Sequence, residues 1–218
     1  MSDKLNSKRV KMSLQMTASL KKNNYHQYIN IMEKQLSVKR VAVLATDGFE
    51  QSEFKKPIKA LKKEGFLVDV ISLNKGKIKG WKNTKWGNKF KIDVTINQAL
   101  STNYDMLVLP GGVMNTDTLR TSELAIRFVS DFFEQKKPVA AICHAGSILI
   151  EPGLLKDKQL TSYKSIKTDL INAGADWKDE EVVVDNKLIT SRCPKDLPAF
   201  CQKMIEELKK EIHASLTE

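Results

Sequence analysis

The sequence contains only three cysteines, Cys143, Cys193 and Cys201, among 218 residues. They form no Cys-x-x-Cys pair, and no cysteine and histidine share the spacing of a metal site. This scarcity argues against a disulfide framework and favours a reducing compartment, so we expect a cytoplasmic protein. No metal or cofactor motif is recognisable, and we expect none to be bound.

Long apolar runs are also missing. No segment approaches the roughly 18 apolar residues of a membrane-spanning helix, so we expect no membrane partner. Residues 1–37 are basic but lack the apolar stretch of a secretory signal, and they only faintly resemble a transit peptide. We interpret them as an extension that is disordered or forms an accessory helix. The rest of the chain predicts one domain over residues 38–212 and a short tail over 213–218.

Acidic residues are outnumbered, and the net charge is +10. Residues 1–37 hold seven Lys/Arg and two acids, which gives +5, and the remainder holds 29 and 24, which also gives +5. The basic charge is thus half terminal and half spread over surface lysines. Because nucleic-acid binding needs basic residues clustered on one face, and no nucleic-acid-binding signature is present, we expect no nucleic-acid partner.

Strand and helix patterns alternate along the chain. The apolar runs at 38–45, 66–73, 105–109 and 138–142 are typical of strands buried on both faces of a parallel sheet. Amphipathic patterns predict helices over 50–64, 117–135 and 196–211, and a short helix at 166–173. Turn residues predict a hairpin within 74–98. Short strands are predicted at 160–163, 181–185 and 187–191. Pro57 predicts either a helix start or a kink, and Thr116 is a plausible N-cap. The alternation predicts an α/β sandwich around a mostly parallel sheet.

One stretch departs from simple strand and helix patterns. The apolar run that begins at Pro138 ends at Ile142, and Cys143, His144, Ala145 and Gly146 follow before apolar residues resume. A strand that turns sharply into a helix displays the turn residue at the carboxyl edge of the sheet, as serine hydrolases do. Cys143 is therefore the candidate nucleophile, and the following amides and helix dipole favour its thiolate.

Other candidate residues follow neighbouring strands. Glu50 and Glu53 follow the strand at 38–45, and either they stabilise a helix N-terminus or one of them shares a proton with a buried thiol. Gly111 and Gly112 follow the strand at 105–109, either as a plain turn or as an anion site. His144 is the histidine nearest the cysteine, either as a base or in a structural role. Ligands bind beyond the carboxyl ends of parallel strands, so these loops are expected to converge.

Several segments together resemble the ThiJ/PfpI superfamily, specifically its PfpI-like branch. They are Phe49-Glu-Gln-Ser-Glu-Phe54 with Pro57, Leu107-Val-Leu-Pro-Gly-Gly112, Lys137-Pro-Val-Ala-Ala-Ile-Cys-His144, Leu160-Thr-Ser-Tyr163, Asp169-Leu-Ile-Asn-Ala-Gly-Ala175 and Glu181-Val-Val-Val-Asp185, in that order over residues 38–210. The resemblance implies a flavodoxin-like three-layer sandwich and a homodimer or larger assembly.

The resemblance also implies roles for individual residues. Cys143 matches the reactive cysteine of the family, Glu53 the acid that hydrogen-bonds it, and Glu50 a second acid. The remaining matches are His144 as the neighbouring histidine, Gly112 and His144 as amide donors, and Tyr163 as a site tyrosine. Two positions depart from the pattern. The first is Ala145, which precedes Gly146 where the family has Cys-His-Gly. The second is Thr116-Asp117, which stand where some members carry a glutamate that completes a triad in the partner subunit. Asp117 is the proposed substitute for that glutamate.

The candidate functions belong to three classes. The leading hypothesis, implied by the resemblance, is a stress-protective cysteine enzyme acting on small reactive carbonyls or on modified proteins, with glyoxalase III, deglycase or peptidase-like activity. The alternative is a non-enzymatic sensor or chaperone that uses oxidation of Cys143. A glutamine amidotransferase shares the fold but needs a distal His-Glu pair, and no suitable histidine follows Cys193.

Overall fold

The computed structural model describes residues 39–214, with side chains described up to residue 210. The predicted N-terminal extension over 1–37 and residues 215–218 of the predicted tail over 213–218 lie outside the described residues, whereas residues 213 and 214 belong to the last helix. A seven-stranded sheet forms the centre, in the order β10-β11-β7-β6-β1-β2-β5. Its strands are β1 (Arg40–Leu44), β2 (Leu67–Ser72), β5 (Val94–Thr95), β6 (Met106–Leu109), β7 (Val139–Ile142), β10 (Val182–Asp185) and β11 (Leu188–Ser191). All neighbours are parallel except β10 and β11, which are antiparallel.

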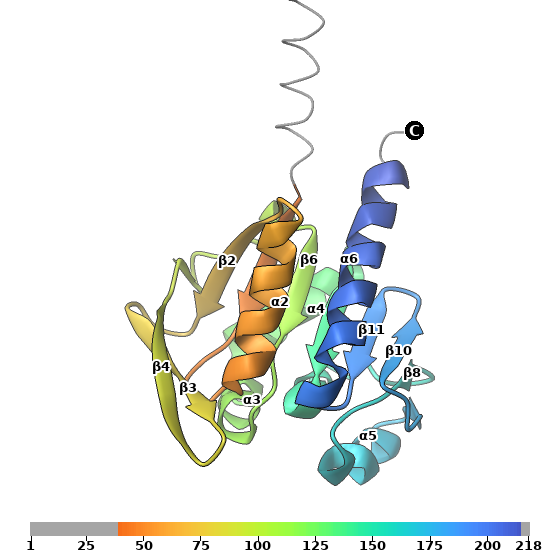
Figure 1. Cartoon of the computed structure of the whole chain (residues 1–218). Coiled ribbons are helices and arrows are strands. Elements are labelled where there is room, and N and C mark those ends of the chain that lie inside the picture. Colours follow the sequence, from red (N-terminus) through yellow and green to blue (C-terminus); the bar gives the residue numbers. More distant parts are fainter. Residues whose placement is uncertain (1–38, 215–218) are drawn as a thin grey trace, which may run out of the picture. The chain divides into compact units, whose positions relative to one another are not determined.

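Helices cover both faces of this sheet (Figure 1). Side chains alternate along β1, so that Val41 and Val43 join one apolar cluster while Ala42 and Leu44 join the other. The first cluster includes side chains of α2 (Gln51–Lys63) and α6 (Leu197–Ala214), and the second includes those of α3 (Val113–Arg120), α4 (Glu123–Glu134) and α5 (Lys167–Asn172). This arrangement confirms the predicted α/β three-layer sandwich.

The strand order places the predicted site loops together. From β1 the chain proceeds to β2 on one side, and from β6 it proceeds to β7 on the other. Strand order therefore reverses between β1 and β6, and crevices at such switch points are the usual ligand sites of open α/β sheets. The carboxyl ends of β1, β6 and β7 lead into residues 45–50, 110–112 and 143–149.

Three details of the predicted helices are settled by the structure. The helix predicted over 117–135 is two helices, α3 and α4, and Ser122 caps the second by accepting a hydrogen bond from the Ala125 amide at 3.3 Å. Thr116 is not an N-cap, because it lies inside α3 and its hydroxyl bonds the Gly112 carbonyl oxygen at 3.1 Å. The helix predicted over 50–64 is present as α2, and of the two alternatives for Pro57 a helix start is excluded, because Pro57 lies inside α2.

Smaller elements complete the domain. The predicted hairpin is a separate two-stranded sheet of β3 (Lys77–Lys82) and β4 (Lys85–Lys91), and β8 (Gln159–Leu160) pairs with β9 (Asp176–Trp177). Short 3-10 segments are η1 (Ser101–Asn103), η2 (Cys143–Leu149), η3 (Lys164–Ile166) and η4 (Pro194–Asp196). Within residues 39–214, no helix combines the length and apolar character needed to cross a bilayer.

An aspartate closes part of one sheet edge. The Asp93 amide donates to the Val70 carbonyl oxygen at 2.9 Å, and the Asp93 carboxylate accepts a hydrogen bond from the Val70 amide, also at 2.9 Å. Strand β5 begins at the next residue, Val94, which pairs with Ile71. Asp93 therefore acts as an additional strand residue on the outer edge of β2.

Candidate active site

The cysteine elbow is a strained turn at the end of β7. Ile142 has extended backbone angles, whereas Cys143 has φ = 63° and begins the 3-10 segment η2. This left-handed conformation costs a non-glycine residue about 1–2 kcal/mol, and such strain concentrates at functional sites. The Tyr163 amide fixes the turn by donating to the Cys143 carbonyl oxygen at 3.1 Å. The thiol is thereby held at the switch point, with only 7% of the residue exposed.

Two backbone amides face the cysteine sulfur. The N–H groups of Gly112 and His144 hydrogen-bond Cys143 and lower the pKa of its thiol. Gly112 has φ = 99°, and a Cβ there would lie 2.4 Å from the Gly48 carbonyl oxygen, so only glycine fits. The pair of amides is placed as an anion site would require, and the choice between that role and a plain turn stays a prediction.

Glu53 lies in the first turn of α2 and is completely buried. Its Oε2 accepts a hydrogen bond from the Gly111 amide at 3.0 Å, while Oε1 has no hydrogen-bond partner among the described residues that meets normal geometry. Burial raises the pKa of Glu53 to about 8, an effect that the nearby Glu50 charge strengthens and that hydrogen bonds from Cys143 and Gly111 oppose. Glu53 therefore holds its proton at neutral pH.

The close approach of three strand ends brings Glu53 and Cys143 together. A Cβ on Gly111 would lie 2.5 Å from Glu53 Oε2 and 2.7 Å from Cys143 Cβ, so both side chains flank this one glycine. Burial, followed by the Glu53 charge, raises the pKa of the Cys143 thiol above its ordinary value, despite the amides of Gly112 and His144. The expectation that amides and helix dipole would make this a low-pKa thiol is therefore wrong. Because a carboxylate and a thiolate repel at this distance, the pair ionises only once, and the thiolate requires the proton to be on Glu53.

His144 contacts the thiol directly. Its Nδ1 lies 3.3 Å from Cys143 Sγ, its Nε2 lies 3.0 Å from Ser165 Oγ, and its ring stacks on Tyr163 with the centroids 4.9 Å apart. Burial lowers the pKa of His144, so the imidazole is neutral at pH 7. Ser165 is a site residue that sequence reasoning missed, because it lies 21 positions away in η3 and no motif marks it.

The two remaining predicted site acids are placed differently. Glu50 is the N-cap of α2 and accepts a hydrogen bond from the Ser52 amide at 3.2 Å. It acts on the site through its charge, which raises the pKa of Glu53. Asp117 is exposed on α3, and no hydrogen bond joins it to Cys143 or His144 within the described part of the chain. Its proposed role across a subunit contact remains a prediction.

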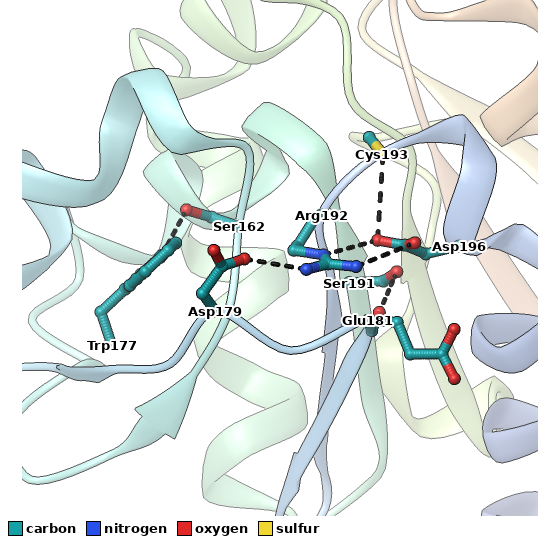
Figure 2. A network of polar contacts seen from close by, with 8 residues as sticks. All are labelled: Ser162, Trp177, Asp179, Glu181, Ser191, Arg192, Cys193 and Asp196. Atoms are coloured by element: carbon teal, nitrogen blue, oxygen red, sulfur yellow. Dashed lines mark hydrogen bonds and ion pairs between the residues drawn. The ribbon is translucent and has the colours of Figure 1, made fainter.

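The other cysteines belong to structural surroundings. Cys193 Sγ lies 3.8 Å from Asp196 Oδ2, and Arg192 bridges Asp196 and Asp179 at 2.8 Å each (Figure 2). This ion-pair network connects the loop after β9 to the start of α6. Cys201 lies in α6, and burial raises its pKa to about 11. Among the described residues, no group of three or more His, Cys, Asp or Glu is arranged to hold a metal ion.

We expect Gly112→Ala to lower the free energy of unfolding by about 3 kcal/mol, because its Cβ would meet backbone atoms and φ = 99° strains any L-residue. Gly146→Ala is the matched control, since its Cβ would meet Leu170 Cδ1 at an ordinary 3.5 Å. Its effect should stay within about 1 kcal/mol. Urea denaturation followed by circular dichroism measures both, and equal losses would contradict the steric argument.

Comparison with known proteins agrees with this geometry. The model of the DJ-1/PfpI family matches residues 39–207. The putative cysteine protease YraA of Bacillus subtilis is 45% identical over 172 residues, which cover 78% of this chain and 99% of that protein. Protein/nucleic acid deglycase 2 of Escherichia coli is 41% identical over 171 residues, which cover 78% of this chain and 98% of that protein.

A solved two-domain protein of Anabaena variabilis, with DJ-1/ThiJ/PfpI-like and ferritin-like domains, superposes with a TM-score of 0.75 at 40% identity. The match covers 78% of this chain and 48% of that one, so the chain spans about half of that protein. The resemblance seen in the sequence is thereby confirmed, and the chain belongs to the DJ-1/PfpI family.

Proposed function

We propose that the protein is a cysteine-dependent enzyme that acts on reactive dicarbonyls and on the early adducts they form with amines. The observation that carries the proposal is the Cys143 thiol, held between the amides of Gly112 and His144 and beside the protonated Glu53. The relatives named deglycase and putative cysteine protease support the choice of a cysteine-based reaction. The oxidation-sensor alternative has no observation of its own in its favour.

The reaction begins with addition of sulfur to an aldehyde such as that of methylglyoxal. The neutral imidazole of His144, 3.3 Å from Sγ, accepts the thiol proton as the carbon–sulfur bond forms. The carbonyl oxygen, which becomes negative, takes the proton held by Glu53 and gives a hemithioacetal. The carboxylate left behind is buried, and its raised pKa drives it to recover a proton later in the cycle.

Internal proton transfer then converts this adduct to a hydroxy acid. Removal of the hydrogen on the sulfur-bearing carbon gives an enediol, and protonation of the neighbouring carbon gives a thioester of Cys143. Water hydrolyses the thioester and restores the thiol. The aldehyde carbon is oxidised while the ketone carbon is reduced, so no external oxidant is needed.

An early adduct of an amine enters the same sequence. In the hemiaminal, the carbon–nitrogen bond breaks and the amine leaves with a proton, which frees the dicarbonyl for the thiol. Amines of proteins and of nucleobases both form such adducts, and we propose modified proteins as the substrate class alongside free carbonyls. We further propose a homodimer or larger assembly in a reducing cytoplasm, in line with the sequence-based expectations.

The test is direct turnover by the purified full chain. We expect the protein to convert methylglyoxal to lactate, and to restore the unmodified lysine side chain of a freshly glycated peptide faster than buffer alone does. Lactate is measured by a coupled dehydrogenase assay and the peptide by mass spectrometry. Hydrolysis of casein without lactate formation would instead favour a peptidase, and inactivity on all three substrates would reject the proposal.

A further inference from the structure

The β3–β4 hairpin has a surface whose chemistry the active site does not use. Figure 1 shows the hairpin beside α2 at the margin of the domain. We call its outer face the Lys-Trp ribbon, which consists of Lys77, Lys79, Trp81, Trp86, Lys89 and Lys91. Residues 74–92, which include the whole hairpin, contain seven lysines and no acidic residue.

The inner face of the hairpin fixes the ribbon to the core. Ile78 pairs with Phe90 across the strands, and Ile78 is buried. The Phe90 ring lies 5.0 Å from that of Phe54 and 5.6 Å from that of Phe49, between centroids. Because successive strand residues point to opposite faces, this packing directs the neighbouring lysines outward. The ribbon is therefore presented on a supported platform.

The outer face places like charges directly opposite one another. Lys77 pairs with Lys91 and Lys79 with Lys89 across the two strands, and directly opposed like charges destabilise a sheet. No ion pair neutralises these four lysines within the described part of the chain. An anionic partner would remove this repulsion, so the charge arrangement is complementary to a surface of closely spaced negative groups.

Two tryptophans interrupt the lysines. Trp81 pairs with Trp86, with ring centroids 5.4 Å apart, and the Lys79 ammonium lies 5.2 Å from the centroid of the Trp86 ring. Trp81 is held by its indole N–H, which donates to the Asn83 carbonyl oxygen at 2.8 Å. Trp86 nevertheless remains 44% exposed. An indole with a lysine beside it is the combination favoured at the boundary between lipid headgroups and acyl chains.

We propose that the Lys-Trp ribbon binds the surface of an anionic phospholipid bilayer, with Trp86 at the headgroup boundary and the lysines on the phosphates. Stacking of nucleic-acid bases fits less well, because the Lys79 ammonium and the Trp81 ring already occupy the surroundings of the Trp86 ring. Lipid binding requires only that the indole edge be exposed. The proposal revises the sequence-based expectation of no membrane partner, which rested on the lack of a spanning segment.

Vesicle sedimentation tests the charge requirement. The full-length chain should bind vesicles of phosphatidylcholine with 30% phosphatidylglycerol, and not vesicles of phosphatidylcholine alone. Because each lysine near an anionic surface contributes about fivefold, the variant Lys77→Gln/Lys89→Gln/Lys91→Gln should bind roughly a hundredfold more weakly. Lys136→Gln/Lys156→Gln/Lys158→Gln, with the same charge change away from the ribbon, should bind as the unmodified chain does. Equal binding by the two variants would overturn the proposal.

Tryptophan fluorescence tests the contact itself. Anionic vesicles should shift the emission of the unmodified chain to shorter wavelength, and Trp86→Phe should abolish the shift. Trp177→Phe is the control. Like Trp86, Trp177 has a lysine over its ring, Lys167 at 4.7 Å, but it lies outside the ribbon, where its indole N–H donates to Ser162 Oγ. A shift that survives in Trp86→Phe overturns the proposal. The proposal is also overturned if Lys77→Gln/Lys89→Gln/Lys91→Gln loses affinity for a single-stranded oligonucleotide while its binding to vesicles is unchanged.

Discussion

Replacement of Cys143 by alanine should lower the rate of lactate formation from methylglyoxal by roughly a thousandfold or more, because no other group can form the covalent adduct. Alanine keeps the Cβ and removes only the sulfur of a residue that is 7% exposed. The strained φ of 63° suits alanine no worse than cysteine. Folding should therefore be preserved, and the loss should appear in kcat.

The matched control is Cys201→Ala, which removes a partly buried thiol from α6, outside the site. That variant should keep kcat within about twofold, as expected for a substitution without contact to the site. Both variants are compared by steady-state kinetics and by mass spectrometry of the protein trapped with substrate. An adduct on Cys201 or Cys193, or unchanged turnover in Cys143→Ala, would remove the basis of the proposed function.

Glu53→Gln should make the protein more stable at alkaline pH while lowering its activity. The folded-state pKa of Glu53 is raised from 4.5 to about 8, so the folded chain binds more protons than the unfolded chain between these values. The contribution of Glu53 to the free energy of unfolding is therefore fully present below about pH 4.5 and is lost as the pH rises toward 8. Between about pH 5 and pH 8 this loss amounts to about 3 kcal/mol, which glutamine cannot show because it does not ionise.

Urea denaturation at several pH values measures the difference. The curve of Glu53→Gln should be flatter than that of the unmodified chain over this range, and activity should fall because glutamine cannot deliver the proton to the carbonyl oxygen. Glu50→Gln is the control, since Glu50 is a partly exposed N-cap whose replacement should shift the whole curve and leave most of its slope. Parallel curves for the unmodified chain and Glu53→Gln would show that Glu53 is ionised at neutral pH in the folded protein.

The central part of the fold was predictable because its signals are local. The apolar run ending at Ile142 and the abrupt change at Cys143 predict the elbow without reference to the rest of the chain. Parallel strands then bring Glu53 and Gly112 to the same edge. The family resemblance supplied the pairing of Glu53 with Cys143, which neither periodicity nor spacing could assign.

Other features depend on contacts that sequence patterns do not encode. The break between α3 and α4 at Thr121 and Ser122 leaves the apolar period almost uninterrupted, so one helix was predicted. The contact of Ser165 with His144 depends on how η3 packs on the elbow. The raised thiol pKa depends on burial by all three strand ends, whereas the helix N-terminus alone argued for the opposite direction.

Asp93 limits how copies of this chain can associate. With both backbone hydrogen-bonding groups of Val70 already engaged by Asp93, and with β5 only two residues long, the β2 side of the sheet offers little to an incoming strand. Backbone pairing with a strand of another molecule is therefore hindered at this part of the edge. At this position a contact between copies would be made by side chains rather than by backbone pairing, and a two-fold arrangement of such a contact closes into a dimer.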